Sequence, residues 1–287
     1  MSNFSSHFSL LFAALFLISS CSSDDSSPEE ISVCGCMEES SPNFNAQATC
    51  DDGSCLQLDD EVKTLNILFT STGCGACGIW GIDCHKNYSS AMLKNAVPFE
   101  LHFKYGDPMI NKTNDSFISL VRPQFSPFFS VGLDRSIQQG MDRPHSCELS
   151  GEYAEKLIEE FAAVTPTSKI AVSHLATDDS ITVHYAIELD DAAEDIYYAL
   201  YISEDSLVHT QNAGWKNDLE GYVHHNVVRK SITPVLGRKM KTSSKVGKVT
   251  IHNQEIWNPE HLKAVLVLWN RSDAANPTVY NAEQSTE

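Results

Sequence analysis

The chain has 287 residues and a formal net charge of −18, because 38 Asp and Glu residues outnumber 20 Lys and Arg residues. Such an acidic chain repels phosphate backbones, so we expect no nucleic acid among its partners. Its 42% hydrophobic content supports ordinary cores, and its length fits about two domains.

The N-terminus carries an apolar run, "FSLLFAALFLI" at residues 8–18, which is too short to span a bilayer and has the length of a signal-peptide core. The run ends in "ISSC", residues 18–21, which resembles the lipobox of bacterial lipoproteins. The resemblance implies that residues 1–20 are a lipoprotein signal peptide and that Cys21 carries the lipid. The residues before the run lack the usual Lys and Arg. The alternative is ordinary cleavage that leaves Cys21 as a free thiol.

Residues 21–33 are polar and acidic, and we expect them to form a solvated tether. This stretch resembles the acidic segment that marks some Gram-negative lipoproteins for the cell surface. Lipids on Cys21 would hold the protein at a membrane without spanning it. We therefore expect a lipid-anchored protein of the outer membrane that faces the cell surface, with the periplasmic face as the alternative.

Setting Cys21 aside leaves eight of the nine cysteines, an even number that suits an oxidising exterior. Four of them fall within residues 34–56, a segment too short to build a core, which predicts a small disulfide-rich module. This segment resembles the short GC…DDGSC module of exported bacterial surface proteins. Four cysteines permit three connectivities. The preferred one pairs Cys34 with Cys50 and Cys36 with Cys55.

The same module offers side-chain oxygens that suit calcium. Such residues more often form turns that face water, and that is the interpretation we favour. The candidate ligands are Asn43, Asn45, Asp51 and Asp52.

The next segment combines a buried strand with a cysteine pair. "LNILFT", residues 65–70, has the apolar, β-rich character of a strand, and Cys74 and Cys77 follow it in "TSTGCGACGIWG". The following elements are predicted in chain order as a glycine-rich helix, a strand at 98–105, a short helix at 115–121, a strand pair within 127–139 and an amphipathic helix at 151–164. This order resembles the thioredoxin fold, and it predicts an α/β thioredoxin-like domain over residues 62–165.

The thioredoxin resemblance assigns roles to three residues. Cys74 lies at the predicted helix N-terminus, which lowers a thiol pKa, so it is the expected nucleophile. Cys77 is the expected resolving thiol. Pro127 stands where the family has a cis proline opposite the pair, although a strand start also tolerates an ordinary trans proline. No cofactor is expected.

The chain also departs from the thioredoxin pattern. Gly73 stands where a Trp is usual, and Leu68 stands where the family has a buried Asp that accepts a proton. Glu100 and Asp83 are candidate substitutes for that acid. These departures weaken the expectation of strong reductase activity.

A metal site is the competing interpretation of the cysteine pair, because Cys74, Cys77, Cys84 and His85 form a permissible zinc set. Their spacing is not a common zinc pattern, and the pair follows a strand in thioredoxin order, so we expect no metal. Cys84 lies about 10 Å from Cys77 along the helix. Its predicted partner is therefore Cys147, in a structural disulfide.

Residues 167–287 consist of short alternating runs, which predict an all-β antiparallel sandwich. Blocks at 222–237, 256–270 and 279–282 resemble the Omp28-like lipoprotein family, which joins a thioredoxin-like domain to a β domain behind a lipoprotein signal. His224 and His225 point to opposite faces of a strand, so we expect one to be hydrogen-bonded and the other exposed rather than a metal pair. Trp257 and Trp269 are expected in the core.

Together these patterns predict a lipid-anchored thiol-disulfide oxidoreductase that acts on exported protein or small-molecule disulfides. Whether it is an enzyme is left open. The alternative is a surface binding or adhesion lipoprotein whose thioredoxin-like domain is an inactive scaffold.

Overall fold

The computed structural model describes residues 32–86, 95–104, 106–123, 126–133, 135–136, 147–164, 168–190, 195–254 and 256–286. Within these ranges the side chains of 135–136 and 147–151 are not described. The predicted signal peptide, the lipidation residue Cys21 and the tether up to residue 31 lie outside the described residues. None of the helices in the described ranges has the length and apolar character needed to cross a bilayer.

The first half of the chain builds a mixed sheet around a central apolar strand. Every residue of β1 (Thr64–Thr70) is buried, as its sequence predicts. It runs parallel to β2 (Ala96–His102) and antiparallel to β3 (Phe128–Val131), which in turn pairs with β4 (Arg135–Ser136). The resulting order is β2-β1-β3-β4.

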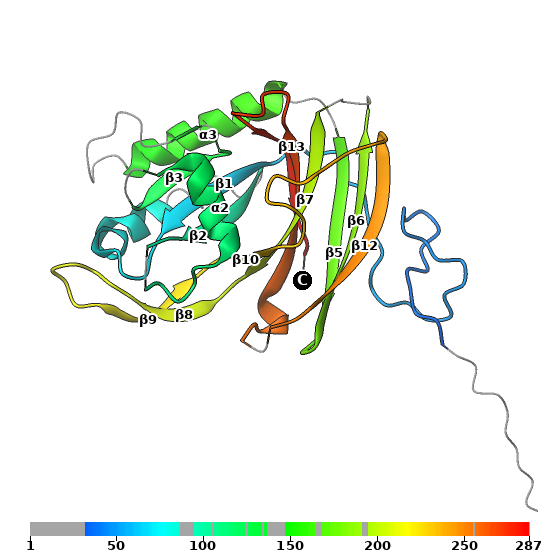
Figure 1. Ribbon diagram of the computed structural model, residues 1–287, viewed down its shortest axis with the longest axis horizontal. Helices are drawn as coiled ribbons and strands as arrows, with labels where there is room; N and C mark the ends of the chain where they lie inside the picture. Colours follow the sequence, from blue (N-terminus) through cyan, green and yellow to red (C-terminus); the bar gives the residue numbers. More distant parts are fainter. Residues whose placement is uncertain are drawn as a thin grey trace, which may run out of the picture. The chain divides into compact units, whose positions relative to one another are not determined.

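Helices accompany this sheet (Figure 1). The first covers residues 75–86 and contains a π-helical turn, η1 (Cys77–Gly81). The second, α2 (Lys112–Val121), begins three residues before the predicted start because Asn111 caps it and accepts the backbone N–H groups of Thr113 and Asn114. The third is α3 (Cys147–Val164). Strand β2 ends before the predicted residue 105, because the chain turns at Lys104, whose φ is 92°.

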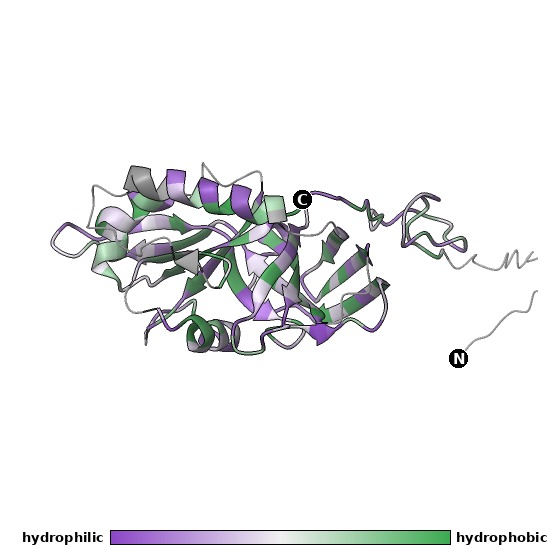
Figure 2. Ribbon diagram, turned by 90° about the horizontal axis from the view of Figure 1, so that it is seen from above, coloured by the Kyte–Doolittle hydropathy of each residue, from purple (hydrophilic) through white to green (hydrophobic). Residues whose placement is uncertain are grey.

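The second half builds two sheets that face each other. Strands β5 (Ser168–Ala176), β6 (Ser180–Leu189) and β12 (Ser244–His252) form one antiparallel sheet. Strands β7 (Ile196–Glu204), β13 (Leu262–Asn270) and β14 (Thr278–Gln284) belong to the other. Their facing side chains form one apolar core, which includes Ile181, Val183, Ile187, Leu200, Ile202 and Leu266. Figure 2 shows hydrophobic residues concentrated along these strands.

One sheet continues from the first half of the chain into the second. Strand β10 (Val227–Ser231) pairs antiparallel with β7 and parallel with β2, where Val227 lies opposite Glu100. The short β11 (Arg238–Lys239) also pairs with β7. The path therefore runs β14-β13-β7-β10-β2-β1-β3-β4 across the predicted boundary at residue 166. A strand edge left unpaired is a liability, and β10 covers the outer edge of β2. The predicted domain boundaries stay a prediction.

A two-stranded hairpin leaves the second half and was not predicted as such. It consists of β8 (Leu207–Gln211) and β9 (Leu219–His224). The alternating run "GYVHHNVVRKSI", residues 221–232, is not one strand, because the chain breaks at Asn226, whose φ is 53°. The break separates β9 from β10 and lets the two strands join different sheets.

The N-terminal module is closed by two disulfides, Cys34 to Cys50 and Cys36 to Cys55. Leu56, just after the module, packs with Ala171 of β5 and Ala186 of β6. The oxygens considered for calcium are used within the module instead: Asp51, Asp52 and Asn45 accept backbone N–H groups two residues on, and Asn43 accepts that of Leu56. These contacts fit the turn-forming role.

The predicted core tryptophans are buried. Trp257 is 8% exposed and Trp269 is fully buried, which confirms their placement. Trp269 Nε1 donates a hydrogen bond to the Tyr201 hydroxyl at 3.0 Å, and that hydroxyl donates to the carbonyl of Val235. Trp215, by contrast, is not in the core: it lies in the loop between β8 and β9 and is 84% exposed.

Candidate functional site

The cysteine pair lies at the start of the helix that follows β1, and it is oxidised. Cys74 and Cys77 form a disulfide. The backbone N–H of Cys77 donates to Cys74 Sγ at 3.1 Å, so one N–H group of the first helical turn points at this sulfur. A thiolate formed at Cys74 on reduction would be stabilised there.

Pro127 lies beside the pair, and its bond to Ser126 is cis. The Ser126 hydroxyl donates to Cys74 Sγ at 3.3 Å, and the Ser126 carbonyl oxygen lies 3.5 Å from the same sulfur. The helix approaches the proline closely at Gly81, where a Cβ atom would come within 2.8 Å of Pro127 Cγ. The cis proline therefore stands against the pair where the thioredoxin resemblance places it.

Residues 211–214, the last residue of β8 and the three that follow it, pack against the turn and helix that carry the pair; we call this segment the cover. Gln211 Nε2 lies 3.2, 3.3 and 3.0 Å from the carbonyl oxygens of Ser71, Thr72 and Cys74. Gly78 lies directly beneath the segment, since a Cβ on it would meet the Asn212 carbonyl oxygen at 2.1 Å. Side chains at this position would displace the cover. Cys74 and Cys77 are each only 4% exposed.

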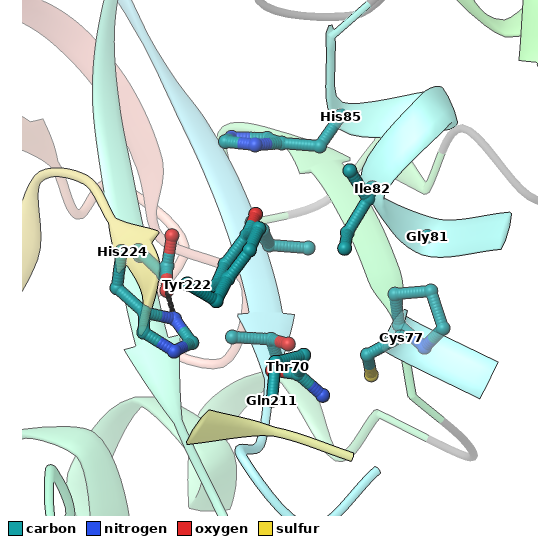
Figure 3. Close-up of a pocket in the computed structure, with 11 residues that line it drawn as sticks. Thr70, Cys77, Gly81, Ile82, His85, Gln211, Tyr222 and His224 are labelled. Atoms are coloured by element: carbon teal, nitrogen blue, oxygen red, sulfur yellow. Dashed lines mark hydrogen bonds and ion pairs between the residues drawn. The ribbon is translucent and has the colours of Figure 1, made fainter. Parts of the chain in front are cut away.

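A small cavity of about 20 Å³ lies beside the pair, and both Cys77 and Pro127 line it. In Figure 3, Cys77, Ile82 and His85 face it from the helix, and Tyr222 and His224 face it from β9. Thr70 and Gln211 lie between these groups. The volume has room for about one water molecule.

A buried network of acids and imidazoles forms one wall of this cavity. Glu100 Oε1 lies 2.7 Å from His102 Nε2 and 3.1 Å from His224 Nδ1. His102 Nδ1 lies 2.9 Å from Asp107 Oδ2, and Asp107 also accepts the backbone N–H groups of Thr72 and Met109. The network ties β2, β9 and the loop before α2 to the turn that carries Cys74.

Electrostatics of the network follow from these contacts. Burial alone would raise the pKa of Glu100, but hydrogen bonds from His102 and His224 outweigh it and hold that pKa well below the usual carboxyl range. Burial likewise opposes charge on His102, yet Asp107 and Glu100 raise its pKa to about 9. The pKa of Asp107 falls to about 2 because the hydrogen bond from His102 outweighs its burial. His102 is therefore a buried cation between two carboxylates when no other cation is bound.

Of the two acids considered for proton transfer, Glu100 and Asp83, only Glu100 lies near the cysteine pair. Glu100 lines the same cavity as Cys77, whereas Asp83 is exposed on the helix surface. Glu100 faces this side because it lies opposite Leu68 in the β1–β2 register, and Leu68 also faces the helix side. The position that the thioredoxin resemblance assigns to a buried Asp is therefore apolar, with a carboxylate on the neighbouring strand.

The alternative zinc set does not form in this state. Cys74 and Cys77 are joined to each other, and Cys84 is also disulfide-bonded. The side chain of Cys147, the predicted partner of Cys84, lies outside the described residues. His85 lines the cavity behind the pair, where burial lowers its pKa.

The histidine pair behaves as its alternation predicted. His224 is 2% exposed and contacts Glu100, whereas the side chain of His225 is 49% exposed and contacts Asp205 Oδ1 at 2.7 Å. The sequence reasoning missed His102 and Asp107. The alternation of Glu100 and His102 on one strand face was a usable signal, but nothing local in the sequence placed Gln211 over the pair.

Comparisons with known proteins bear on the fold. No family model matches the sequence, and no curated protein does either. HBP35 of Porphyromonas gingivalis is structurally similar, with a TM-score of 0.62 and 15% identity over 80% of this chain and 76% of that one. A domain of the outer membrane lipoprotein Omp28 from the same organism matches with a TM-score of 0.30 and 13% identity, over 42% of this chain and 86% of that one. The first likeness concerns the fold alone, and the second is too weak to support an argument.

Proposed function

We propose that this protein is a lipid-anchored thiol-disulfide oxidoreductase that acts on exported disulfides. The observation that carries the proposal is the Cys74–Cys77 disulfide at a helix start, set against the cis Ser126–Pro127 bond. A static disulfide has no need of hydrogen-bond donors aimed at one of its sulfurs. Here Cys74 Sγ receives the Cys77 N–H and the Ser126 hydroxyl, which are groups that would stabilise a thiolate.

The reaction starts from the reduced pair. The Cys74 thiolate attacks one sulfur of a substrate disulfide, forms a mixed disulfide and expels the other substrate sulfur as a thiolate. Cys77 then attacks Cys74 Sγ, restores the Cys74–Cys77 disulfide and releases the second substrate sulfur. The protons of the cysteine pair pass to the two substrate thiols, and two electrons pass to the substrate. In reverse, the same steps oxidise a substrate dithiol.

Attack on a substrate requires that the cover move. Both cysteines are only 4% exposed, and residues 211–214 lie against the helix that carries them, so a substrate disulfide cannot reach Cys74 in this arrangement. The contacts that hold the cover are hydrogen bonds to backbone carbonyls and the close fit over Gly78. Both are local, so a hinge at the ends of β8 and β9 would release them without unfolding the sheet.

The same cover favours a second candidate function. In a surface binding or adhesion lipoprotein, the pair would be a permanent staple and the thioredoxin-like half a scaffold. The reduction potential separates the two. A potential in the range of known exchange proteins, about −270 to −120 mV, supports exchange, and a value below about −300 mV supports a staple.

A trapping experiment tests the exchange directly. Cys77→Ser should accumulate mixed disulfides with the aromatic disulfide dithiobis(nitrobenzoate) or with an exported protein, because the resolving thiol is absent. Cys74→Ser should accumulate none. If both variants behave alike, or if neither thiol reacts until the protein is unfolded, the exchange proposal fails and the scaffold takes its place.

The location is part of the proposal and rests on the "ISSC" motif and the acidic residues after it. Lipids on Cys21 would anchor the chain in the outer membrane, with the surface as the favoured side. Protease added to intact cells should then remove the protein. Survival of the protein until lysis would place it on the periplasmic side instead.

A further inference from the structure

Three side chains from two strands converge on one point behind the cysteine pair. Glu100 and His102 alternate on β2, so their side chains emerge on the same face, and His224 at the end of β9 meets them there. One ligand-type atom from each, among them Glu100 Oε1, lies within 4.8 Å of the others. All three residues are buried, with exposures of 4%, 0% and 2%.

The geometry points to a binding site for one divalent transition-metal ion of the Zn²⁺ class, with Glu100, His102 Nε2 and His224 Nδ1 as ligands. Two imidazoles and a carboxylate are a donor set that such ions take readily. This set shares no residue with the cysteine-based zinc set considered from the sequence.

The spacing of the donor atoms suits an ion after a small adjustment. Ligands bound at about 2.0 Å in a tetrahedron lie about 3.3 Å apart. Glu100 Oε1 is 2.7 Å from His102 Nε2 and 3.1 Å from His224 Nδ1. Side-chain rotations would have to open these two contacts by a few tenths of an ångström. They would also have to bring the two histidine ligand atoms, which lie within 4.8 Å of each other, to the same spacing.

His102 has the outer partner that metal-bound histidines usually have. Its Nδ1 lies 2.9 Å from Asp107 Oδ2, and a carboxylate at that position fixes the tautomer that leaves Nε2 free to bind a metal. Asp107 is itself held by the N–H groups of Thr72 at 2.7 Å and Met109 at 2.8 Å. The orientation of the His102 ring is therefore set before any ion arrives.

Charge balance gives an independent reason. Glu100 and Asp107 bring two negative charges into a buried cluster, and buried charge is costly unless it is compensated. One divalent cation with neutral imidazoles balances the two carboxylates.

The neighbouring cavity supplies the remaining coordination. Glu100 and His224 both line it, so it lies against two of the three proposed ligands. The volume of about 20 Å³ has room for about one water molecule, enough for a fourth ligand. The metal site would thus have three protein ligands and one solvent position.

Metal binding can be measured on the oxidised full-length chain, in which the described cysteines are disulfide-bonded. The protein is stripped with a chelator and titrated with Zn²⁺ in a calorimeter, in competition with a chromogenic chelator. We expect one ion per chain. Glu100→Gln and His224→Gln should each weaken binding at least tenfold, and Asp107→Asn should weaken it about 10- to 100-fold. His225→Gln, the adjacent exposed histidine, should leave it unchanged.

A spectroscopic readout on the unmutated protein guards against variants that fail to fold. Co²⁺ in place of Zn²⁺ should give visible d–d bands without the intense near-ultraviolet band of a cobalt-thiolate bond, and Zn²⁺ should displace it. Absence of binding by the unmutated chain, a thiolate band, or an equal loss in His225→Gln would overturn the assignment. The first of these outcomes would leave the cluster as a proton-bearing network. None of these outcomes depends on thiol exchange, so this inference and the proposed function fail separately.

Discussion

The side chain of Gln211 covers the backbone of Cys74, with Nε2 3.0 Å from the Cys74 carbonyl oxygen. The two residues come from different halves of the chain, and Gln211 is itself only 2% exposed. The amide has two N–H groups and four carbonyl oxygens within 3.3 Å, those of Ser71, Thr72, Cys74 and Asn212. The Gln211 amide thus fits the cluster of carbonyl oxygens in the turn that carries the cysteine pair.

Removing this amide should make the pair more reactive. Gln211→Ala deletes the contacts that hold residues 211–214 over Cys74, and we expect the disulfide to be reduced by dithiothreitol about tenfold faster. The free energy of unfolding should fall by about 1–3 kcal/mol, because buried carbonyls lose their partner. Gln57→Ala, at an exposed position, is the control. Equal reduction rates in the two variants would show that the cover does not limit access.

A methyl group added at Gly78 should also make the cysteine pair more reactive, because it would push the cover away. In Gly78→Ala the new Cβ would lie 2.1 Å from the Asn212 carbonyl oxygen, so the segment has to move. We expect a loss of about 1–3 kcal/mol in stability together with faster alkylation of the reduced pair. Gly73→Ala is matched, since its Cβ would meet only the Ser71 hydroxyl at 3.9 Å. Slower alkylation of Gly78→Ala than of Gly73→Ala would contradict the proposed movement.

The hydrogen-bonded pair Tyr201 and Trp269 should contribute to stability in the core of the continuous sheet. Tyr201→Phe leaves buried Trp269 Nε1 and the Val235 carbonyl without their partner. We expect the free energy of unfolding to fall by about 1–3 kcal/mol in urea denaturation. Tyr153→Phe, on the exposed side of α3, should change it by less than about 0.5 kcal/mol. A Tyr201→Phe protein as stable as the Tyr153→Phe control would rule out this role.

Lipidation can be tested at Cys21, which lies outside the described residues. Replacing Cys21 by Ser removes the acceptor of the lipid, so the protein should move from the membrane pellet to the soluble fraction. Metabolic labelling with a fatty acid should mark the unmodified chain and not the variant. A variant that still sediments with membranes would require another means of attachment.

Local patterns predicted the elements whose signal lies within a few residues. The apolar run before Cys74 is β1. Helix α2 starts earlier than its apolar residues predict, because Asn111 caps it. Alternation separated buried His224 from exposed His225. These features depend on periodicity and capping, which act over short distances.

Features that depend on distant residues were not predictable in the same way. Nothing near Gln211 shows that its amide meets Ser71 and Cys74, and nothing near Val227 shows that it lies beside Glu100. The sequence predicts a glycine-rich helix after the cysteine pair but gives no reason for its glycines. Two of them, Gly75 and Gly78, allow the segment at Asn212 to approach closely. These two glycines are needed because of a segment more than 130 residues away, which the local sequence does not show.

The pairing of β10 with β2 imposes an order of events on folding. As the chain is made from its N-terminus, β1 to β4 can associate early, but the outer edge of β2 waits until Val227 has been added. Contacts between residues so far apart in sequence form slowly, because a long loop has to close. Gln211 also arrives late, so Cys74 and Cys77 spend the first stage of folding uncovered. Oxidants and other thiols therefore have their easiest access to the pair before the fold is complete.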